Sequence, residues 1–303
     1  MIPFHRAKPE HKNAYEQILF CEPPRGCEYS FANIYLWGKQ QIAFIDGCIA
    51  YFSHFNGKTL YPFPIGSGDK KAVIEKLLLD AQERGIPCRL TGLTQQDAQD
   101  LENWFPGRFQ LRNNRDSYDY VYCIADLADL RGKKYQKKRN HVNRFRTEHP
   151  DHQLLRLDGS TLAAAQAFTE EWFRRRMEAD PEGDFVLEKL AMEKAFRHFD
   201  ELGMEGLVLV DEGRVLAVTM GSRLAEDTFD IHFEKALAEV DGAYSTINWG
   251  FARHLREKYP TLRYLDREDD MGLEGLRKAK LSYLPCHMVE KHWACCKEDI
   301  CAD

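Results

Sequence analysis

The sequence predicts an α+β protein in which two modules each carry a mixed, mostly antiparallel sheet flanked by helices. At 303 residues the chain exceeds the size that one hydrophobic core usually serves. Its hydrophobic content of 44%, with 12% aromatic residues, is that of a folded globular protein. Both halves also follow one order: helix pairs, an antiparallel run of three or four strands, then a helix and further strands. No residue-level repeat accompanies this order.

Short apolar runs between tight turns predict the strands of the first half. Asp46-Gly47 and Asn56-Gly57 are the turn signals, because such dipeptides favour the backbone conformations of two-residue hairpins. Apolar residues at helical spacing predict a helix over 69–85 that Gly85 ends, and a second helix that starts near Thr94. The expected strands are 31–37, 41–45, 49–55, 59–65, 88–91 and 118–124.

The second half shows the same kinds of pattern. Asp211-Glu212-Gly213 predicts a hairpin turn between two of its strands. The expected helices are 160–178, 186–202, 243–258 and 273–281. The expected strands are 205–211, 214–223, 227–235, 262–266 and 286–293. We therefore expect a domain over 1–130, a basic connecting helix over 131–152 and a second domain over 153–303.

The segment 131–146 concentrates positive charge on a chain whose net charge is −6. It holds eight Lys and Arg residues and no Asp or Glu. Such a stretch suits contacts to the phosphate backbone of RNA, but a solvated linker helix explains it equally well. The candidate nucleic-acid contacts are Lys133, Lys134, Lys137, Lys138, Arg139 and Arg144.

Composition argues against several classes of protein. No apolar run approaches the roughly 18 residues of a membrane span, and the N-terminus lacks a signal-peptide core. We therefore expect a cytoplasmic protein. The nine cysteines are scattered and odd in number, which indicates reduced thiols. The Cys and His residues of 286–301 do not have the spacing of structural zinc ligands, so no metal is expected.

The strand expected at 227–235 alternates between apolar and ionisable residues. Alternation would place Asp230, His232 and Glu234 on one face. An edge strand with a wet face would explain this pattern without any function. A central strand would instead make the same face a polar cleft, where a carboxylate can act as a base or bind an amine. Both interpretations stay open.

The segment Tyr264–Pro285 carries a short strand pattern, then the charges of 267–270, and then a basic helical turn. Binding and catalytic groups often lie on loops that a rigid scaffold holds. A capped surface helix, with Asp270 near its N-terminus and Glu274 paired with Lys278, is the alternative.

Three segments together resemble a known family: HFEKA…GAYSTIN, LDREDDMGLEGLRKAKLSYLP and KKYQKKRNHVNRF. The family is that of bacterial proteins related to the C-terminal catalytic domain of phosphatidylglycerol lysyltransferase, formerly a domain of unknown function. The resemblance covers essentially the whole chain. It implies a tandem GNAT-like acyltransferase fold, distantly similar to the Fem aminoacyltransferases.

The resemblance implies transfer of an aminoacyl group from aminoacyl-tRNA to a hydroxyl or amine acceptor, at a cleft in the second module. Aminoacyl-tRNA or acyl-CoA would be a co-substrate, with no resident cofactor, and the basic helix would contact tRNA. We expect Glu234 or Asp270 to accept a proton, and Arg267 and Lys280 to stabilise charge. The residues expected to bind substrate are His232, Lys235, Tyr244, Glu268, Arg277 and Lys278.

Two departures from the family limit this expectation. The chain has no counterpart of the membrane-embedded domain of lipid-modifying synthases, which leaves the acceptor open and allows only peripheral membrane contact. Neither half has the R/Q-x-x-G-x-G/A loop that holds the pyrophosphate of acetyl-CoA in related enzymes. The alternatives are a non-catalytic RNA-binding module on a GNAT-like fold, and a CoA-dependent N-acyltransferase with a degenerate loop.

Overall fold

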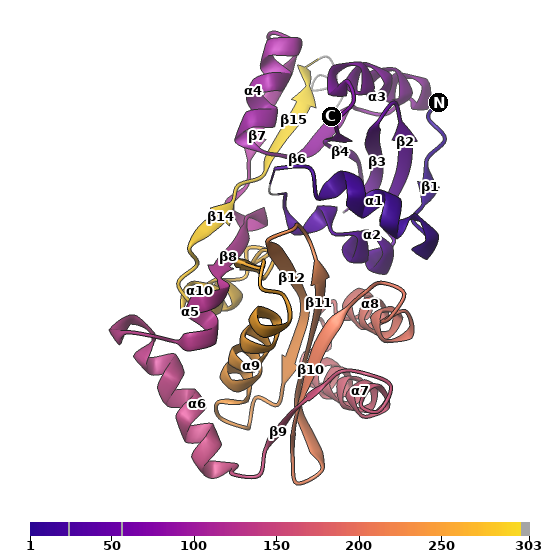
Figure 1. Ribbon diagram of the computed structural model, residues 1–303. Coiled ribbons are helices and arrows are strands. Elements are labelled where there is room, and N and C mark those ends of the chain that lie inside the picture. The colour runs from indigo at the N-terminus through magenta and orange to yellow at the C-terminus, as the bar shows by residue number, and fades with distance from the viewer. Residues whose placement is uncertain (24, 56, 298–303) are drawn as a thin grey trace. The chain divides into compact units, whose positions relative to one another are not determined.

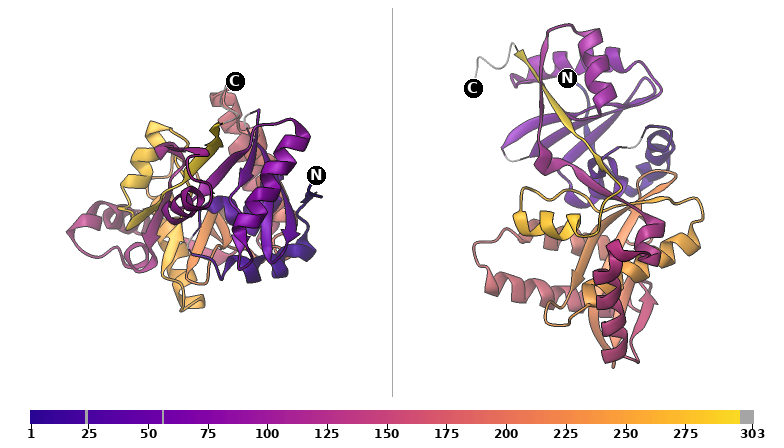
Figure 2. Two further views of the ribbon diagram at one scale, coloured as in Figure 1. Left: turned by 90° about the horizontal axis from the view of Figure 1, so that it is seen from above. Right: turned by 90° about the vertical axis from the view of Figure 1, so that its left-hand side faces the viewer.

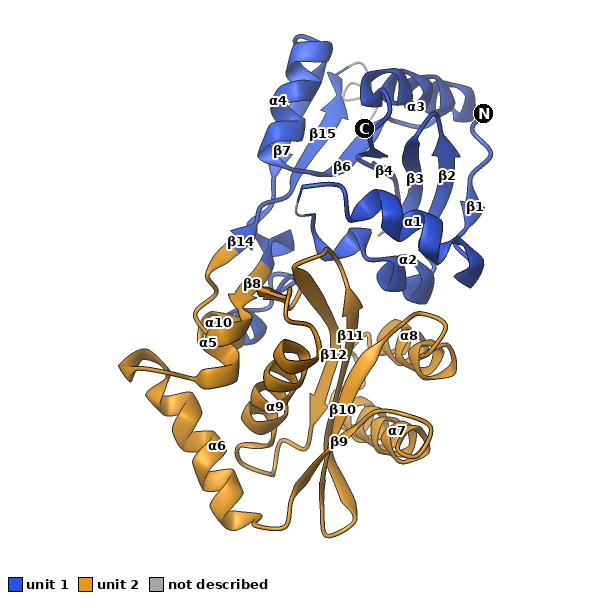
Figure 3. Ribbon diagram, in the orientation of Figure 1, with its two compact units in different colours: residues 1–119, 269–277, 288–303 blue, residues 120–268, 278–287 orange. Residues whose placement is uncertain are grey.

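A computed structural model describes residues 1–23, 25–55 and 57–297 (Figure 1). The chain forms two compact units (Figure 3). Unit 1 combines residues 1–119 with 269–277 and 288–303, and unit 2 combines 120–268 with 278–287. Both units are therefore discontinuous in sequence, whereas the sequence analysis expected two continuous domains. No helix in the described ranges combines the length and apolarity that a membrane crossing requires.

Unit 1 is built on an eight-stranded sheet with the order β1-β2-β3-β4-β6-β15-β7, and β5 pairs with β3. Neighbouring strands are antiparallel except for β4 and β6, which are parallel. β15 comes from the end of the chain and inserts between β6 and β7 (Figure 2). The strands are β1 (His5–Arg6), β2 (Gln40–Ile45), β3 (Cys48–Phe55), β4 (Lys58–Pro62), β5 (Ile65–Gly66), β6 (Arg89–Leu93), β7 (Phe109–Asn113) and β15 (His292–Cys296).

Local sequence signals set the helices of unit 1. The Asp69 side chain accepts a hydrogen bond from the Ala72 amide and caps α3, and Gly85 ends that helix in the left-handed conformation. Thr94 caps α4 in a capping box with Asp97. Both predicted helices are therefore confirmed. The helices are α1 (Lys12–Leu19), α2 (Phe31–Trp37), α3 (Lys70–Arg84) and α4 (Gln95–Trp104).

The prediction of a strand over 31–37 was wrong, because this segment forms helix α2. Residues 31–36 are all buried, so the run shows no helical alternation between apolar and polar positions. The local signals lay at its ends. The Ser30 side chain accepts a hydrogen bond from the Asn33 amide, and Gly38 follows in the left-handed conformation.

Unit 2 is built on a seven-stranded sheet with the order β14-β8-β13-β12-β11-β10-β9. β12 and β13 run parallel, and β11 pairs antiparallel with both β10 and β12. The turn at Glu212 and Gly213 joins β10 to β11 as predicted, with both residues at positive φ. The strands are β8 (Asp119–Cys123), β9 (Gln153–Arg156), β10 (Glu205–Asp211), β11 (Arg214–Arg223), β12 (Thr228–Ala236), β13 (Tyr264–Asp266) and β14 (His287–Val289).

Helices cover both faces of the unit 2 sheet. α9 lies on one face, and α7 and α8 lie on the other (Figure 1). The apolar side chains of β10 to β13 are buried between these layers. The predicted strand over 286–293 is instead two strands, β14 and β15. The helices are α5 (Ile124–Asp129), α6 (Gln136–Glu148), α7 (Leu162–Ala179), α8 (Val186–Arg197) and α9 (Ala243–Lys258). A further helix, α10 (Glu274–Leu281), belongs to unit 1 up to Arg277 and to unit 2 from Lys278.

Candidate functional site

An irregularity in β12 decides where its ionisable side chains point. Phe229 packs against Phe251 of α9, and Glu234 accepts a hydrogen bond from Asn248 of the same helix. Strict alternation would put residues 229 and 234 on opposite faces. The pairing of β11 with β12 shifts register between Met220 and Ser222, which brings Glu234 onto the α9 face.

The predicted shared face of Asp230, His232 and Glu234 was therefore wrong. Asp230 follows Phe229 directly, so its side chain points away from α9, whereas Glu234 points toward it. Gly221 was the signal in the sequence, since a glycine inside a strand often marks a bulge. A Cβ atom at this position would collide with the carbonyl oxygen of Asp230.

Glu234 forms a largely buried ion pair with Arg267, the residue that follows β13. Arg267 Nη2 lies 2.9 Å from Glu234 Oε1, and the two side chains are only 15% and 9% exposed. Asn248 Nδ2 lies 3.3 Å from the second carboxylate oxygen. Burial alone would lower the pKa of Arg267, but Glu234 together with the Tyr122 and Tyr283 phenols outweighs it and leaves that pKa raised. Arg267 therefore keeps its charge in this buried position.

Two tyrosine rings border the Arg267 guanidinium. Its Cζ atom lies 4.9 Å from the ring centroid of Tyr283 and 5.7 Å from that of Tyr122. Burial raises the pKa of both phenols, so both stay neutral. The Tyr122 hydroxyl donates a 2.8 Å hydrogen bond to the carbonyl of Lys280. The rings exclude water from one side of the guanidinium and strengthen its interactions with charge.

Lys138 of α6 approaches the same tyrosine. Its Nζ atom lies 3.5 Å from the ring centroid of Tyr283, and the residue is partly buried. Burial and the Arg267 charge lower its pKa to about 8, against an opposing effect of Glu234. Lys138 was predicted to contact RNA, but the structure places it beside the Glu234–Arg267 pair. We call Lys138, Glu234, Arg267 and Tyr283 the Arg267 cluster.

The Lys280 side chain contacts the backbone of Arg267. Its ammonium donates a hydrogen bond to the carbonyl oxygen of Arg267, and only 9% of the residue is exposed. The Arg267 amide in turn donates to the carbonyl of Tyr120. Both contacts hold the chain where it leaves β13 and so orient the Arg267 side chain. Direct charge stabilisation by Lys280 stays a prediction.

A second polar group in unit 2 gathers around His232. Its Nε2 atom lies 2.8 Å from Ser222 Oγ, and its Nδ1 atom lies 3.3 Å from both Asp230 Oδ2 and Glu268 Oε1. Asp266 pairs with Asp230 across the parallel strands. One ligand atom each from Asp230, His232 and Glu268 lies within 4.8 Å of the others, so these residues could bind a metal ion.

Asp270 and Arg277 belong to unit 1 and bind each other there. Asp270 is fully buried, and its two oxygens lie 2.8 Å from Nη2 and Nε of Arg277. Arg277 also contacts Asp116 at 2.6 Å, and the Gly272 amide donates to Asp270. This bidentate pair stabilises the turn before α10 and raises the pKa of Arg277. Proton transfer by Asp270 stays a prediction.

The remaining predicted substrate residues have different surroundings. Lys235 faces α7 and α8, where its ammonium lies 2.7 Å from Glu188 and over the Trp172 ring. Tyr244 lies 39% exposed at the start of α9, and burial raises its pKa. Lys278 is exposed on α10. Their predicted contacts with substrate are untested.

The basic side chains of this segment lie in different environments. Lys133 and Lys137 are exposed, whereas Lys134 pairs with Asp126 at 3.0 Å. Arg139 donates hydrogen bonds to the carbonyls of Leu130 and Gly132, so it holds the turn before the helix. Arg144 pairs with Asp241. Lys133 and Lys137 are therefore the predicted RNA contacts best placed to meet a polyanion.

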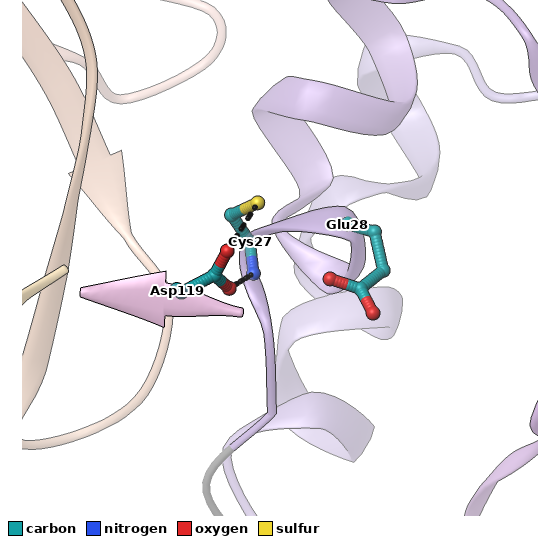
Figure 4. A group of neighbouring side chains, drawn as sticks. All are labelled: Cys27, Glu28 and Asp119. Atoms are coloured by element: carbon teal, nitrogen blue, oxygen red, sulfur yellow. Dashed lines mark hydrogen bonds between the residues drawn. The ribbon is translucent and has the colours of Figure 1, made fainter. Parts of the chain in front are cut away.

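A group in unit 1 combines a thiol with carboxylates (Figure 4). Cys27, Glu28 and Asp119 each offer one possible ligand atom within 4.8 Å of the others. The buried Lys291 ammonium lies 2.6 Å from Glu28, 2.8 Å from Asp119 and 3.6 Å from the Cys27 sulfur. The ammonium therefore occupies the position that a metal cation would take. Its pKa is raised well above the usual value, because Asp119, Cys27 and Glu28 together outweigh its burial.

The C-terminal Cys and His residues do not form a further metal group among the residues described. Cys286 and His287 belong to unit 2, whereas His292, Cys295 and Cys296 belong to unit 1. Neither of the two possible metal groups includes any of them. Cys301 lies outside the described residues.

Comparison with known proteins now identifies the family. The model of the family "Phosphatidylglycerol lysyltransferase, C-terminal" matches residues 22–295. The chain belongs to this family. No curated protein sequence matches it. A conserved protein of unknown function from Bacteroides thetaiotaomicron is 36% identical over 98% of this chain and 100% of its own, with a TM-score of 0.93.

More distant structures share the fold of this family member. L-PGS from Bacillus licheniformis is 14% identical over 98% of this chain and 94% of its own, with a TM-score of 0.71. FemX is 12% identical over 97% of each chain, with a TM-score of 0.61. The fold is the tandem GNAT-like acyltransferase fold, as predicted. At these identities the two likenesses establish the fold and leave substrate and activity open.

Proposed function

We propose that this family member is an acyltransferase that moves an aminoacyl group from aminoacyl-tRNA to a hydroxyl or amine acceptor at the Arg267 cluster. Family membership supports transferase chemistry. The proposed location rests on the surroundings of Arg267. Its Nη1 atom is buried and has no hydrogen-bond partner among the described residues. A buried guanidinium donor without an acceptor is costly, which favours a ligand oxygen as its partner.

The chemistry needs little beyond positioning, because an aminoacyl ester is already activated. Attack on its carbonyl develops negative charge on the carbonyl oxygen. We propose that Arg267 donates to this oxygen and that the tyrosine rings keep the guanidinium partly dry. Glu234 fixes Arg267 through Oε1, and its Oε2 has lone pairs left to accept the ammonium of the aminoacyl group. No covalent enzyme intermediate is required.

The exposed Lys133 and Lys137 are proposed to hold the tRNA backbone. The same two residues would suffice for the alternative of a non-catalytic RNA-binding module. The two functions differ at the Arg267 cluster, which only the transferase needs.

The test is transfer of a labelled amino acid. Total tRNA is charged with one radiolabelled amino acid at a time and incubated with the protein, either with vesicles of a hydroxyl-bearing anionic phospholipid or with a lysine-containing peptide. We expect label to reach one class of acceptor, and binding of charged tRNA to weaken with salt. Absence of transfer for every amino acid, with tRNA still bound, would favour the RNA-binding module. Thermal stabilisation by acetyl-CoA but not by tRNA would favour the CoA-dependent enzyme.

A further inference from the structure

The transfer reaction needs a group that takes a proton from the acceptor. Glu234 is poorly suited, because its Oε1 accepts from Arg267 and its Oε2 accepts from Asn248 and, in the proposed function, from the ammonium of the aminoacyl group. Asp270 has two arginines at its carboxylate, Arg277 at 2.8 Å and Arg115 at 3.7 Å, and the same argument applies. These two carboxylates are the proton acceptors that the sequence predicted.

Lys138 differs from both carboxylates in its contacts. No ion pair or side-chain hydrogen bond holds its ammonium among the described residues, and its cation–π contact to Tyr283 keeps it at the cluster. Arg267 approaches the same ring, so two cations share one aromatic side chain. Burial of the lysine and electrostatic repulsion between the two cations favour the neutral form of the amine, since the guanidinium cannot lose its proton.

Resting on the proposed function, we infer that Lys138 is the catalytic residue that accepts the proton of the attacking hydroxyl or amine. Its amine starts neutral and takes the proton as the acceptor oxygen or nitrogen bonds to the carbonyl carbon. The ester bond between that carbon and the ribose oxygen then breaks. Lys138 returns the proton to the ribose oxygen, so the products are the acylated acceptor and tRNA with a free hydroxyl. The amine ends neutral, and the step requires no other reactant.

The electrostatics of the site agree with this role. A pKa of about 8 leaves roughly a tenth of the Lys138 amine neutral at pH 7, and a base works best when its pKa lies near the operating pH. Removal of Arg267 should raise the pKa of Lys138, whereas removal of Glu234 should lower it, because these two residues act on it in opposite directions.

The experiment compares Lys138→Arg with wild type across pH 6 to 10. Arginine keeps the positive charge but cannot act as a base. We expect at least about a hundredfold loss of transfer at pH 8, because proton transfer by a positioned group contributes 10²–10⁴-fold. Wild-type activity should rise with pH and level off above about pH 8, and Lys138→Arg should lose this rise. Lys189→Arg, in a partly exposed pair with Glu193 on α8, is the control and should match wild type.

A second measurement does not depend on activity. The Lys138 amine is reductively methylated with ¹³C-formaldehyde and titrated by NMR in wild type, Glu234→Gln and Arg267→Met. A pKa near that of an ordinary lysine in wild type would overturn the inference. Transfer that survives Lys138→Arg with an unchanged pH profile would overturn it too, and would leave the proposed function intact. Absence of transfer in wild type would instead overturn the proposed function and, with it, this role.

Discussion

The ion pair between Glu234 and Arg267 should couple strongly in a double-mutant cycle of Glu234→Gln and Arg267→Met. At 2.9 Å, two unit charges attract by about 6 kcal/mol in a medium with an effective dielectric constant of about 20. Desolvation of two groups that are 15% and 9% exposed offsets much of this attraction. We expect a coupling free energy of about 2 kcal/mol, within the range found for contacting residues.

The assay is hydrogen exchange, measured by mass spectrometry on peptides from β12 and β13. Glu234 lies in β12, and Arg267 directly follows β13. Each single variant leaves one charge buried without its partner, so exchange should accelerate. The double variant should exchange more slowly than the two single effects predict, by roughly thirtyfold for about 2 kcal/mol. The exposed pair of Arg174 with Glu171 is the control and should show no resolvable coupling. A coupling below about 0.5 kcal/mol for the buried pair would refute the reasoning.

Three further predictions follow from side chains outside that pair. The double variant Lys133→Glu with Lys137→Glu should bind tRNA more weakly. In a salt titration, the slope of log binding constant against log salt concentration should become shallower by about one for each phosphate that a lysine no longer neutralises. An unchanged slope would contradict the proposed contact of these lysines with tRNA. Phe229→Ala should lower the free energy of unfolding, measured by urea denaturation, by about 3–5 kcal/mol, because this fully buried ring packs on α9. A decrease of less than about 1 kcal/mol would contradict the packing described for this core. Hydrogen bonds from Lys258 and Tyr259 and the contact with His254 outweigh burial and lower the pKa of Glu205 to about 2. Its contribution to stability is therefore complete above about pH 4.5 and disappears as the pH falls toward 2. Wild type and Glu205→Gln should converge in stability over that range.

Much of the secondary structure was predictable because its signals are local. Asp69, Gly85 and Thr94 set helix ends through contacts within a few residues, and Asp46-Gly47 sets a hairpin. The place of β15 was not predictable, because its partners in β6 and β7 lie about 200 residues away in sequence. Pairing over such separations depends on the whole sheet and leaves no local pattern.

The candidate site was predictable in part. The sequence singled out both Glu234 and Arg267, and the structure brings them together. It did not predict that Lys138 and Tyr283 join them, because residues so distant in the chain meet only through the tertiary fold. A solvated helix and a helix that supplies one side chain to a site share the same composition, which explains why Lys138 was grouped with its exposed neighbours.

The most direct test of the central claim is the single-turnover rate of aminoacyl transfer by Arg267→Met. If Arg267 donates to the carbonyl oxygen in the transition state, the variant should bind charged tRNA as wild type does and transfer about 10²–10³-fold more slowly. Lys189→Met, which removes a partly exposed cation on α8, should leave the rate unchanged. A transfer rate for Arg267→Met within threefold of wild type would contradict the claim that the Arg267 cluster performs the transfer.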